Sequence, residues 1–520
     1  MKRRYLGLFA GLGALLVLPP AAFGAEGDLQ LAIDGGLSNT VGINSLWVIV
    51  AACFVFFMQA GFAFLEIGFS RAKNAGTVIA KILTNFSIAA LCWWAVGFAF
   101  AFSGPLGGFI GHEGGFFLTD LGPVVNDAGF RPDFPVMSLS DATIDAKFFF
   151  QFAFCAVSLA IVWGTTLERI KFGAYVIYSI VFASLIYPLG AHWVFGGGFL
   201  QTGDLWRILG VDDWQTWGMQ DFAGSTAVHL IGATGALAAL LLLGARKGKY
   251  GSDGKPRAIP GHNMPLFGLG VLILWLGWFG FNPGSTLGAL DGRFPEILVI
   301  TNIAAAAGVL FAVITVKLKT GTIDIGMAGN GAIAGLVAIT APSGYVEVWA
   351  APIIGAVAGV LVVFCVYAID KLIDDPVGAL SAHGVAGIWG TLACGIFTAP
   401  RLAQYNAFGD PEGGLWYSGS FQQLLVQTVG FLVAFSMVFA ISYLTFFAIK
   451  KTIGLRVSEE EEDAGLDISE HGMYGYPEQF IPPEEYPAGA TVGGPVPAPS
   501  ATAATVSAMS ADPPPEKPQL

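Results

Sequence analysis

The chain of 520 residues is 54% hydrophobic and only 12% charged, and its mean hydropathy is +0.66. Soluble domains carry about 25% charged residues, so this composition indicates a polytopic membrane protein. The net charge of −12 arises mainly in residues 451–520, which hold twelve acidic and three basic side chains. No basic surface for nucleic acid is predicted, and a binding partner of that kind is excluded.

Residues 1–25 have the pattern of a signal peptide. Lys2, Arg3 and Arg4 precede an apolar run, and small residues surround Gly24, after which cleavage is expected. An uncleaved first helix is the alternative interpretation. Residues 26–42 then form a short segment outside the membrane.

The body of the chain, residues 43–450, is predicted to be all α-helical and to cross the membrane eleven times. Each predicted span is long enough for about 30 Å of hydrocarbon. The spans are residues 43–68, 77–102, 147–167, 172–196, 221–245, 264–284, 296–316, 325–342, 347–369, 379–398 and 422–449.

Lysine and arginine residues predict the orientation. With the N-terminus outside, the cytoplasmic loops and tail hold fifteen of these residues and the outside loops hold five. Basic residues gather on the cytoplasmic side of membrane proteins. We therefore expect a multi-pass protein of the cell membrane with an outside N-terminus and a cytoplasmic C-terminus.

One motif occurs twice, five predicted spans apart. Asp221, Gly224 and His229 have the same spacing as Asp375, Gly378 and His383. Spans five apart cross in opposite directions, which predicts an inverted repeat of five plus five helices with one extra helix, as in many transporters. The two aspartates are expected to cap their helices, and Asp221, on the outside, to help attract a cation.

The paired histidines are the strongest functional signal. An ionisable residue inside a span is expensive and marks a functional site by default. Two neutral imidazoles facing each other can share a proton and line a narrow path. Histidines that only pack helices and a two-histidine metal site are the alternatives, but no third metal ligand accompanies either copy.

Aromatic residues cluster at the outer ends of several spans. Phe150, Gln151 and Phe154 begin the third span, Trp193 and Phe195 end the fourth, and Trp275, Trp278, Phe279, Phe281 and Ser285 lie near the end of the sixth. Aromatic faces attract cations, and a serine hydroxyl accepts a hydrogen bond. An interfacial aromatic belt is the alternative.

Several motifs together resemble the Amt/Mep/Rh ammonium transporter family, on its Amt side, over residues 40–476. They are Met58 to Glu66 with Arg71-Ala-Lys-Asn74, Asp221-Phe-Ala-Gly-Ser-Thr-Ala-Val-His229, Trp278-Phe-Gly-Phe-Asn-Pro-Gly-Ser285, Asn330 to Pro342, and Asp374 to His383. The resemblance implies a homotrimer with one pore in each subunit. It assigns the twin pore histidines to His229 and His383, and the phenylalanine gate to Phe154 and Phe281.

The resemblance also assigns an outer ammonium site. Its residues would be Phe154, Ser285, Asp221 and an aromatic wall, for which Phe195 is preferred over Trp193, with Phe150, Gln151 and Trp278 in support. The family often has tryptophan at this wall, so Phe195 is a departure that implies altered cation–π strength.

Residues 451–480 resemble the regulatory C-terminus of the family, which couples to PII-type signal proteins. Gly454-Leu-Arg456 and Leu466 to Gly472 carry this match, whereas Met473 departs from the acidic residue often found there. Residues 481–520 are rich in Pro, Ala, Ser and Thr and are predicted to be disordered.

The predicted function is transport of ammonium, with methylammonium as an analogue. NH4+ would bind at the outer site and lose a proton, and NH3 would pass the histidines, with the proton following or not. The alternatives are a neutral-gas (CO2) channel and an ammonium sensor that signals through its tail. The sequence contains no nucleophile–base–acid set and no cofactor fingerprint, so we predict neither an enzyme nor a bound cofactor or metal.

Overall fold

The structure is a computed structural model that describes residues 39–119, 134, 136–137, 140–405 and 408–480. These residues form helices joined by loops, with two isolated β-bridges and no strand among them. The predicted signal peptide, most of the segment 26–42 and the tail 481–520 lie outside the described residues, so these expectations remain predictions.

Ten helical stretches of the described chain are long and apolar enough to cross a membrane. They are α3 (Asn39–Phe69), η1–α4–η2–α5 (Ala72–Phe102), α6 (Ile144–Thr165), α7–η5–α8 (Phe172–Phe195), η7–α10 (Ser225–Leu243), α11 (Met264–Gly284), α12 (Phe294–Thr320), α14 (Ala350–Ile369), η9–α15 (Leu380–Phe397) and α17 (Gln422–Thr452).

The predicted span 325–342 corresponds to a shorter helix, α13 (Ile325–Thr340). Its 16 residues extend about 24 Å at 1.5 Å per residue, less than the usual hydrocarbon thickness. The residues from Gly329 to Thr340 are buried, and α12, α14 and α15 pack along the helix. The all-helical fold is confirmed, whereas the number of eleven spans is not.

The helices divide into a central group and a peripheral group. In the most apolar window of α6, 89% of the residues are buried inside the protein, against 28% for α17. Large apolar side chains such as Leu83, Leu272 and Leu444 are more than 60% exposed. A lipid-facing surface explains these exposed leucines, because hydrocarbon does not penalise apolar side chains as water does.

Close contact between α3 and α11 depends on glycines of α11. A Cβ atom at Gly270 would lie 2.3 Å from the backbone nitrogen of Leu65, and one at Gly280 would lie 2.4 Å from the carbonyl oxygen of Ala51. Glycine therefore lets the two backbones approach. This packing fixes the position of α11, which carries Trp278, Phe281 and, at its C-cap, Ser285.

The two copies of the Asp–Gly–His motif fold alike. Each histidine lies on a short π-helix, η7 (Ser225–Leu230) or η9 (Leu380–Val385), that opens a longer α-helix. Gly224 and Gly378 precede them with positive φ angles of 116° and 75°, a conformation that favours glycine.

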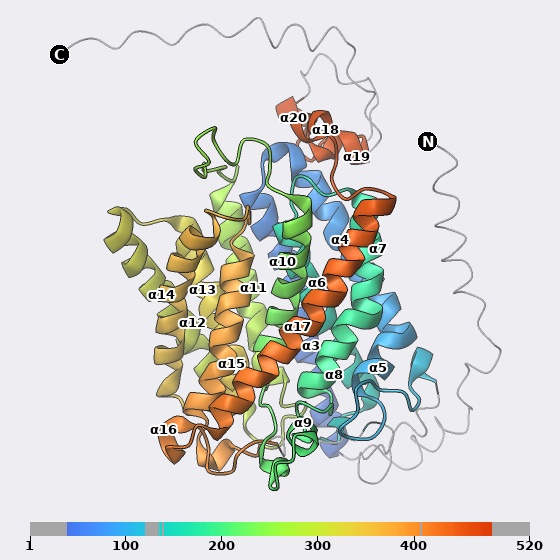
Figure 1. Cartoon of the computed structure of the whole chain (residues 1–520), viewed down its shortest axis with the longest axis vertical. Coiled ribbons are helices and arrows are strands. Elements are labelled where there is room, and N and C mark those ends of the chain that lie inside the picture. Colours follow the sequence, from blue (N-terminus) through green and yellow to red (C-terminus); the bar gives the residue numbers. More distant parts are fainter. Residues whose placement is uncertain (1–38, 120–133, 135, 138–139, 406–407, 481–520) are drawn as a thin grey trace, which may run out of the picture.

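The two helices that continue from these π-helices run in opposite directions (Figure 1). α10 (Ile231–Leu243) ends beside the C-terminal segment, where Arg456 donates to the carbonyl of Leu243. α15 (Ala386–Phe397) ends beside α16 (Leu415–Ser418), at the opposite end of the protein, where the Phe397 and Trp416 rings lie 6.3 Å apart. The predicted inversion of these two helices therefore matches the fold.

The segment after α17 folds back over one end of the helices through α18 (Glu459–Ala464), α19 (Leu466–His471) and α20 (Pro477–Phe480) (Figure 1). Asp467 is fully buried and accepts hydrogen bonds from the backbone N–H groups of Gly76 and Thr77, at 3.0 and 2.7 Å. The backbone of Leu455 also accepts from Lys171 N–H. We call this end of the molecule the tail side.

Candidate functional site

A cavity opens at the end of the helices away from the tail. Phe154, Phe195 and Ser285 line it, together with Gln151 and seven further residues: Phe102, Val136, Met137, Gln201, Phe222, Ala223 and Leu287. The volume open to the centre of a water-sized molecule is about 40 Å³, enough for a few atoms. The aromatic walls suit a small cation.

Two polar groups of this cavity can accept hydrogen bonds. Among the residues that the structure describes, the buried side-chain carbonyl oxygen of Gln151 has no hydrogen-bond partner. The hydroxyl of Ser285 donates to the carbonyl of Phe281 at 2.9 Å, which leaves its oxygen lone pairs as acceptors. A small donor such as an N–H cation is therefore the ligand that satisfies both groups.

Two phenylalanine rings close the inner end of this cavity. Phe154 and Phe281 stack with their centroids 3.9 Å apart and their planes 19° apart, and both are buried. Phe150 packs on Phe154 with centroids 4.6 Å apart. A hydrated ion cannot pass this stack unless the rings move.

His229 and His383 lie directly behind the stack. The His229 ring is 5.4 Å from Phe281 and 5.3 Å from Trp278, between centroids, and the Nδ1 atoms of the two histidines are 3.2 Å apart. One Nδ1–H thus donates to the other Nδ1 when both rings are neutral. Trp278 is held in turn by its indole N–H, which donates to Thr340 at 2.9 Å.

A second cavity begins at His383 on the side toward the tail. It has about 20 Å³ open to the centre of a water-sized molecule, just enough for one water. Its walls are mainly aliphatic, and Glu66, Asn330 and His383 are its polar members. The two cavities, the phenylalanine stack and the histidine pair therefore follow one another through the centre of the protein.

Asp221 is buried at the start of η7, but it is not among the residues that line the outer cavity. Its Oδ1 accepts from the N–H groups of Gly224 and Ser225, and its Oδ2 from those of Thr226 and Ala227, at 2.7 to 3.0 Å. This carboxylate caps the helix that carries His229. Asp375 makes the corresponding bonds to Gly378 and Leu380 before η9.

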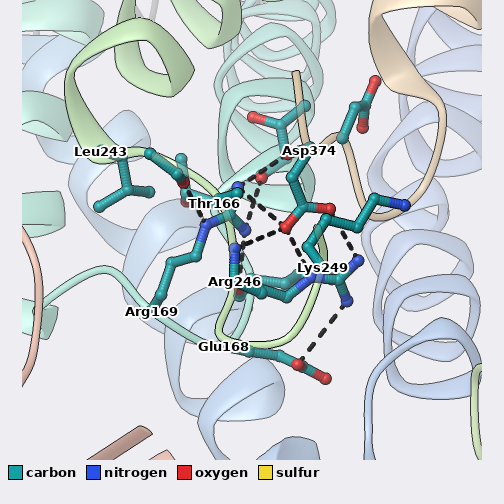
Figure 2. A network of polar contacts seen from close by, with 12 residues as sticks. Thr166, Glu168, Arg169, Leu243, Arg246, Lys249 and Asp374 are labelled. Carbon is teal, nitrogen blue, oxygen red and sulfur yellow. Dashed lines mark hydrogen bonds and ion pairs between the residues drawn. The ribbon is translucent and has the colours of Figure 1, made fainter. Parts of the chain in front are cut away.

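A buried ionic cluster fixes the loops on the tail side (Figure 2). Arg246 donates to both carboxylate oxygens of Asp374 at 2.9 Å, and Arg169 lies 3.8 Å from the same carboxylate. Arg246 also lies 3.7 Å from Glu168, which pairs with Arg71 at 2.6 Å. Asp374 is the neighbour of the capping residue Asp375, so the cluster holds the start of η9.

Electrostatics in this cluster favour the charged forms of its carboxylates. Burial alone would raise the pKa of Asp374, but hydrogen bonds from Arg246 and the charges of Arg169 and Arg246 outweigh burial and lower the pKa to about 2. Burial likewise opposes the charge of Glu168, and the charges of Arg246 and Arg71 lower its pKa below the usual range.

Most of the site residues predicted from the sequence lie along the series formed by the outer cavity, the phenylalanine stack, the histidine pair and the inner cavity. Trp193 is an exception. The Trp193 indole N–H donates to the carbonyl of Phe109, and its ring packs on Phe199, whereas Phe195 lines the outer cavity. Sequence reasoning missed Phe222 and Gln201 in the outer cavity and Asn330 and Glu66 in the inner one. Glu66 carried a usable signal, since an acid inside an apolar span marks a functional site.

The helical fold and the narrow line of cavities define a membrane transport protein for a small solute. Comparison with known proteins narrows this class. Residues 46–476 match the profile of the Ammonium Transporter Family. Ammonium transporter Amt2 of Archaeoglobus fulgidus is 42% identical over 453 residues, which cover 87% of this chain and 92% of that relative. Ammonium transporter Amt1 of Haloferax mediterranei is 35% identical and covers 84% of this chain and 80% of that relative.

Solved structures agree with these sequence matches. A protein described as a Sensor Amt Protein superposes with a TM-score of 0.72 at 37% identity, covering 83% of this chain and 99% of its own. Mep2 of Candida albicans superposes with a TM-score of 0.69 at 28% identity, covering 81% and 87% of the two chains. The chain belongs to the ammonium transporter family.

Proposed function

We propose that this protein transports ammonium across the cell membrane by the twin-histidine pathway. NH4+ is recruited in the outer cavity by Phe154, Phe195, Ser285 and Gln151 and loses a proton there. NH3 then passes the Phe154–Phe281 gate and the His229–His383 pair. The observation that carries this proposal is the order of these groups, with an aromatic cavity, a ring gate and two hydrogen-bonded imidazoles in sequence.

Selectivity follows from desolvation. A potassium ion that enters the ring gate and the imidazole path loses its hydration shell and finds no counter-charge there, which costs many kcal/mol. Ammonium avoids this penalty because it can leave its proton behind and cross as a neutral molecule. The histidine nitrogens then offer a hydrogen-bond donor and an acceptor to NH3.

In this proposal the outer cavity faces the outside of the cell and the tail side faces the cytoplasm. The excess of basic residues in the loops on the tail side supports this orientation. We further propose that three copies assemble, each with its own pore, and that a PII-type regulator binds the folded segment 451–480. The proton that NH4+ releases either passes to water on the outer side or crosses the membrane by a separate route.

Uptake of labelled methylammonium into proteoliposomes that contain the full chain tests the proposal. We expect uptake above that of protein-free liposomes, inhibited by unlabelled ammonium and unaffected by an equal concentration of potassium. Uptake no faster than in protein-free liposomes would refute the transport function. Equal inhibition by potassium would refute the selectivity mechanism.

An ammonium sensor is the second candidate, and the folded tail favours it. The buried Asp467 joins the tail to the N-terminus of α4, so a rearrangement among the helices can reach a cytoplasmic partner through the tail. The similarity to a Sensor Amt Protein also supports this candidate. Capture of a PII-type protein that requires residues 452–480 and changes with ammonium would support signalling, and capture that is unaffected by either would exclude it.

A further inference from the structure

Glu66 is a buried acid that the proposed pathway does not yet use. It lies on α3, one turn before the helix ends on the tail side, and it is only 1% exposed. Its Oε2 atom has no hydrogen-bond partner in the described part of the chain. Leaving a buried carboxylate oxygen unpaired costs about 1 to 3 kcal/mol or more, so a purely structural role leaves this oxygen unexplained.

The Glu66 side chain borders the inner cavity, which also reaches His383 and Asn330. The carboxylate lies tightly against α6, because a Cβ atom at Gly164 would be 2.9 Å from Oε1. The space left beside it is about 20 Å³, the size of one small molecule such as water or ammonia. A molecule that leaves His383 toward the tail side therefore meets this carboxyl group.

Two further polar side chains are buried near Glu66. One is Lys81, which is fully buried on α4. The Lys81 ammonium is held 3.7 Å from the centre of the Trp163 ring and donates to the carbonyl of Ile170. The Trp163 indole N–H lies beside Glu66 and also lacks a hydrogen-bond partner in the described chain. Neither Lys81 nor Trp163 lines the inner cavity, so Glu66 is the group of this cluster that a molecule in the cavity meets.

We propose that Glu66, with His383 and Asn330, forms an exit site at which ammonia regains a proton and binds as ammonium. This inference rests on the proposed transport of ammonia past the histidines. The O–H bond of the Glu66 carboxylic acid breaks and an N–H bond forms, giving ammonium and carboxylate with no change in total charge. The ammonium leaves on the tail side, and the carboxylate takes a proton from water there, which leaves hydroxide in the solution on that side.

The carboxylate that remains on Glu66 attracts the new cation, so the two products of the transfer are held together beside Asn330 and His383 until the cation leaves. A carboxyl group that transfers protons contributes about 100-fold or more to the rate of such a step. Without the Glu66 carboxylic acid, ammonia in the inner cavity either returns past the histidines or is protonated only after it reaches the bulk solution.

Chemical modification tests the binding site directly. The full chain is treated with dicyclohexylcarbodiimide, which reacts with protonated carboxyl groups in apolar surroundings, and the peptide containing Glu66 is analysed by mass spectrometry. We expect modification of Glu66 that saturating ammonium chloride slows several-fold and choline chloride does not. An unmodified Glu66, or a rate that is the same in both salts, would overturn the exit site.

Transport by Glu66→Gln tests the protonation step. We expect uptake of labelled methylammonium into proteoliposomes to fall at least about tenfold, whereas the concentration for half-maximal uptake, set at the outer cavity, changes less than about twofold. Glu347→Gln is the matched control, because Glu347 lies at the opposite end of the protein in an exposed pair with Arg401. Its uptake rate should equal that of the wild type.

If the wild type carries no ammonium, the proposed function is wrong. If the wild type carries ammonium and Glu66→Gln carries it equally fast, only the exit site is wrong. If Glu66→Gln fails to fold, as judged by its thermal unfolding, the protection of Glu66 in the wild type decides the question.

Discussion

His229 and His383 share a hydrogen bond but have different surroundings. The His229 ring packs against both Trp278 and Phe281, and its Nε2 is buried without a hydrogen-bond partner in the described part of the chain. His383 borders the inner cavity and is 6% exposed. The pair therefore has a dry end toward the ring gate and an end that a small molecule can reach from the tail side. A donor or acceptor from passing ammonia can satisfy the free nitrogen of His229 in turn.

Replacement of Gln151 tests substrate binding in the outer cavity separately from passage through the pore. Its unpaired carbonyl oxygen can accept a hydrogen bond from a cation, worth about 1.5 to 3 kcal/mol. We expect Gln151→Met, which keeps the size of the side chain, to raise the KM for methylammonium about tenfold with little change in kcat. The concentration dependence of uptake measures both constants, and an unchanged KM would exclude Gln151 from the binding site.

At the scale of elements, the two π-helices depend on the aspartates before them. Asp221 pairs with four backbone N–H groups that would otherwise be unsatisfied at a buried helix start. The η7 helix then presents His229 to the ring gate, and η9 presents His383 to His229 from the opposite side. Capping is thus the structural reason for the Asp–Gly–His spacing.

Replacement of the cap should destabilise the protein. Asp221→Asn places an amide N–H group against two backbone donors, so we expect a loss of about 2 kcal/mol or more. Thermal unfolding in detergent measures this loss as a lower Tm. Asp145→Asn, at an exposed site in the first turn of α6, is the control and should unfold within a few degrees of the wild type. Equal Tm values for both variants would contradict the capping role.

The helices and the histidine pair were predictable from the sequence because apolar length and repeated spacing are local signals. The short length of α13 was harder to predict from the sequence. Its apolar run continues to Ala341 and Pro342, whereas the helix ends at Thr340. The walls of the outer cavity were only partly predictable. Phe222 and Gln201 come from loops, and loop conformation depends on contacts between distant segments rather than on local pattern.

At the scale of the whole molecule, the tail and the buried ionic cluster connect the ends of several helices on one side. Arg456 pairs with Glu462 at 2.6 Å and donates to the carbonyl of Ala245, next to Arg246. Glu462 also accepts from the backbone N–H of Lys247. The tail is therefore continuous with the cluster around Asp374, which holds the start of the helix that carries His383.

The ionic cluster predicts how stability changes with pH. The pKa of Asp374 is about 2 in the folded protein against 3.8 for an ordinary aspartate. Its contribution, about 2 kcal/mol, is therefore complete above pH 4 and is lost as the pH falls toward 2. Asp374→Asn removes this contribution and takes from the buried Arg169 and Arg246 the carboxylate that they share, so we expect a lower free energy of unfolding at pH 7 by about 3 to 5 kcal/mol.

Thermal unfolding of both proteins between pH 7 and pH 2 measures this difference. The gap in Tm between the wild type and Asp374→Asn should narrow below pH 4, because the wild type then loses its charged carboxylate. A gap that stays constant down to pH 2 would show that the charge of Asp374 does not stabilise the fold.

The most direct test compares the uptake of labelled methylammonium and of a potassium tracer into proteoliposomes that contain the wild type or the double variant His229→Leu, His383→Leu. His112→Leu is the control, because His112 is exposed in a loop outside the pathway. We predict methylammonium uptake without uptake of the potassium tracer for the wild type and the control, and loss of this selectivity in the double variant. A double variant that carries ammonium with undiminished rate and selectivity would contradict the twin-histidine mechanism.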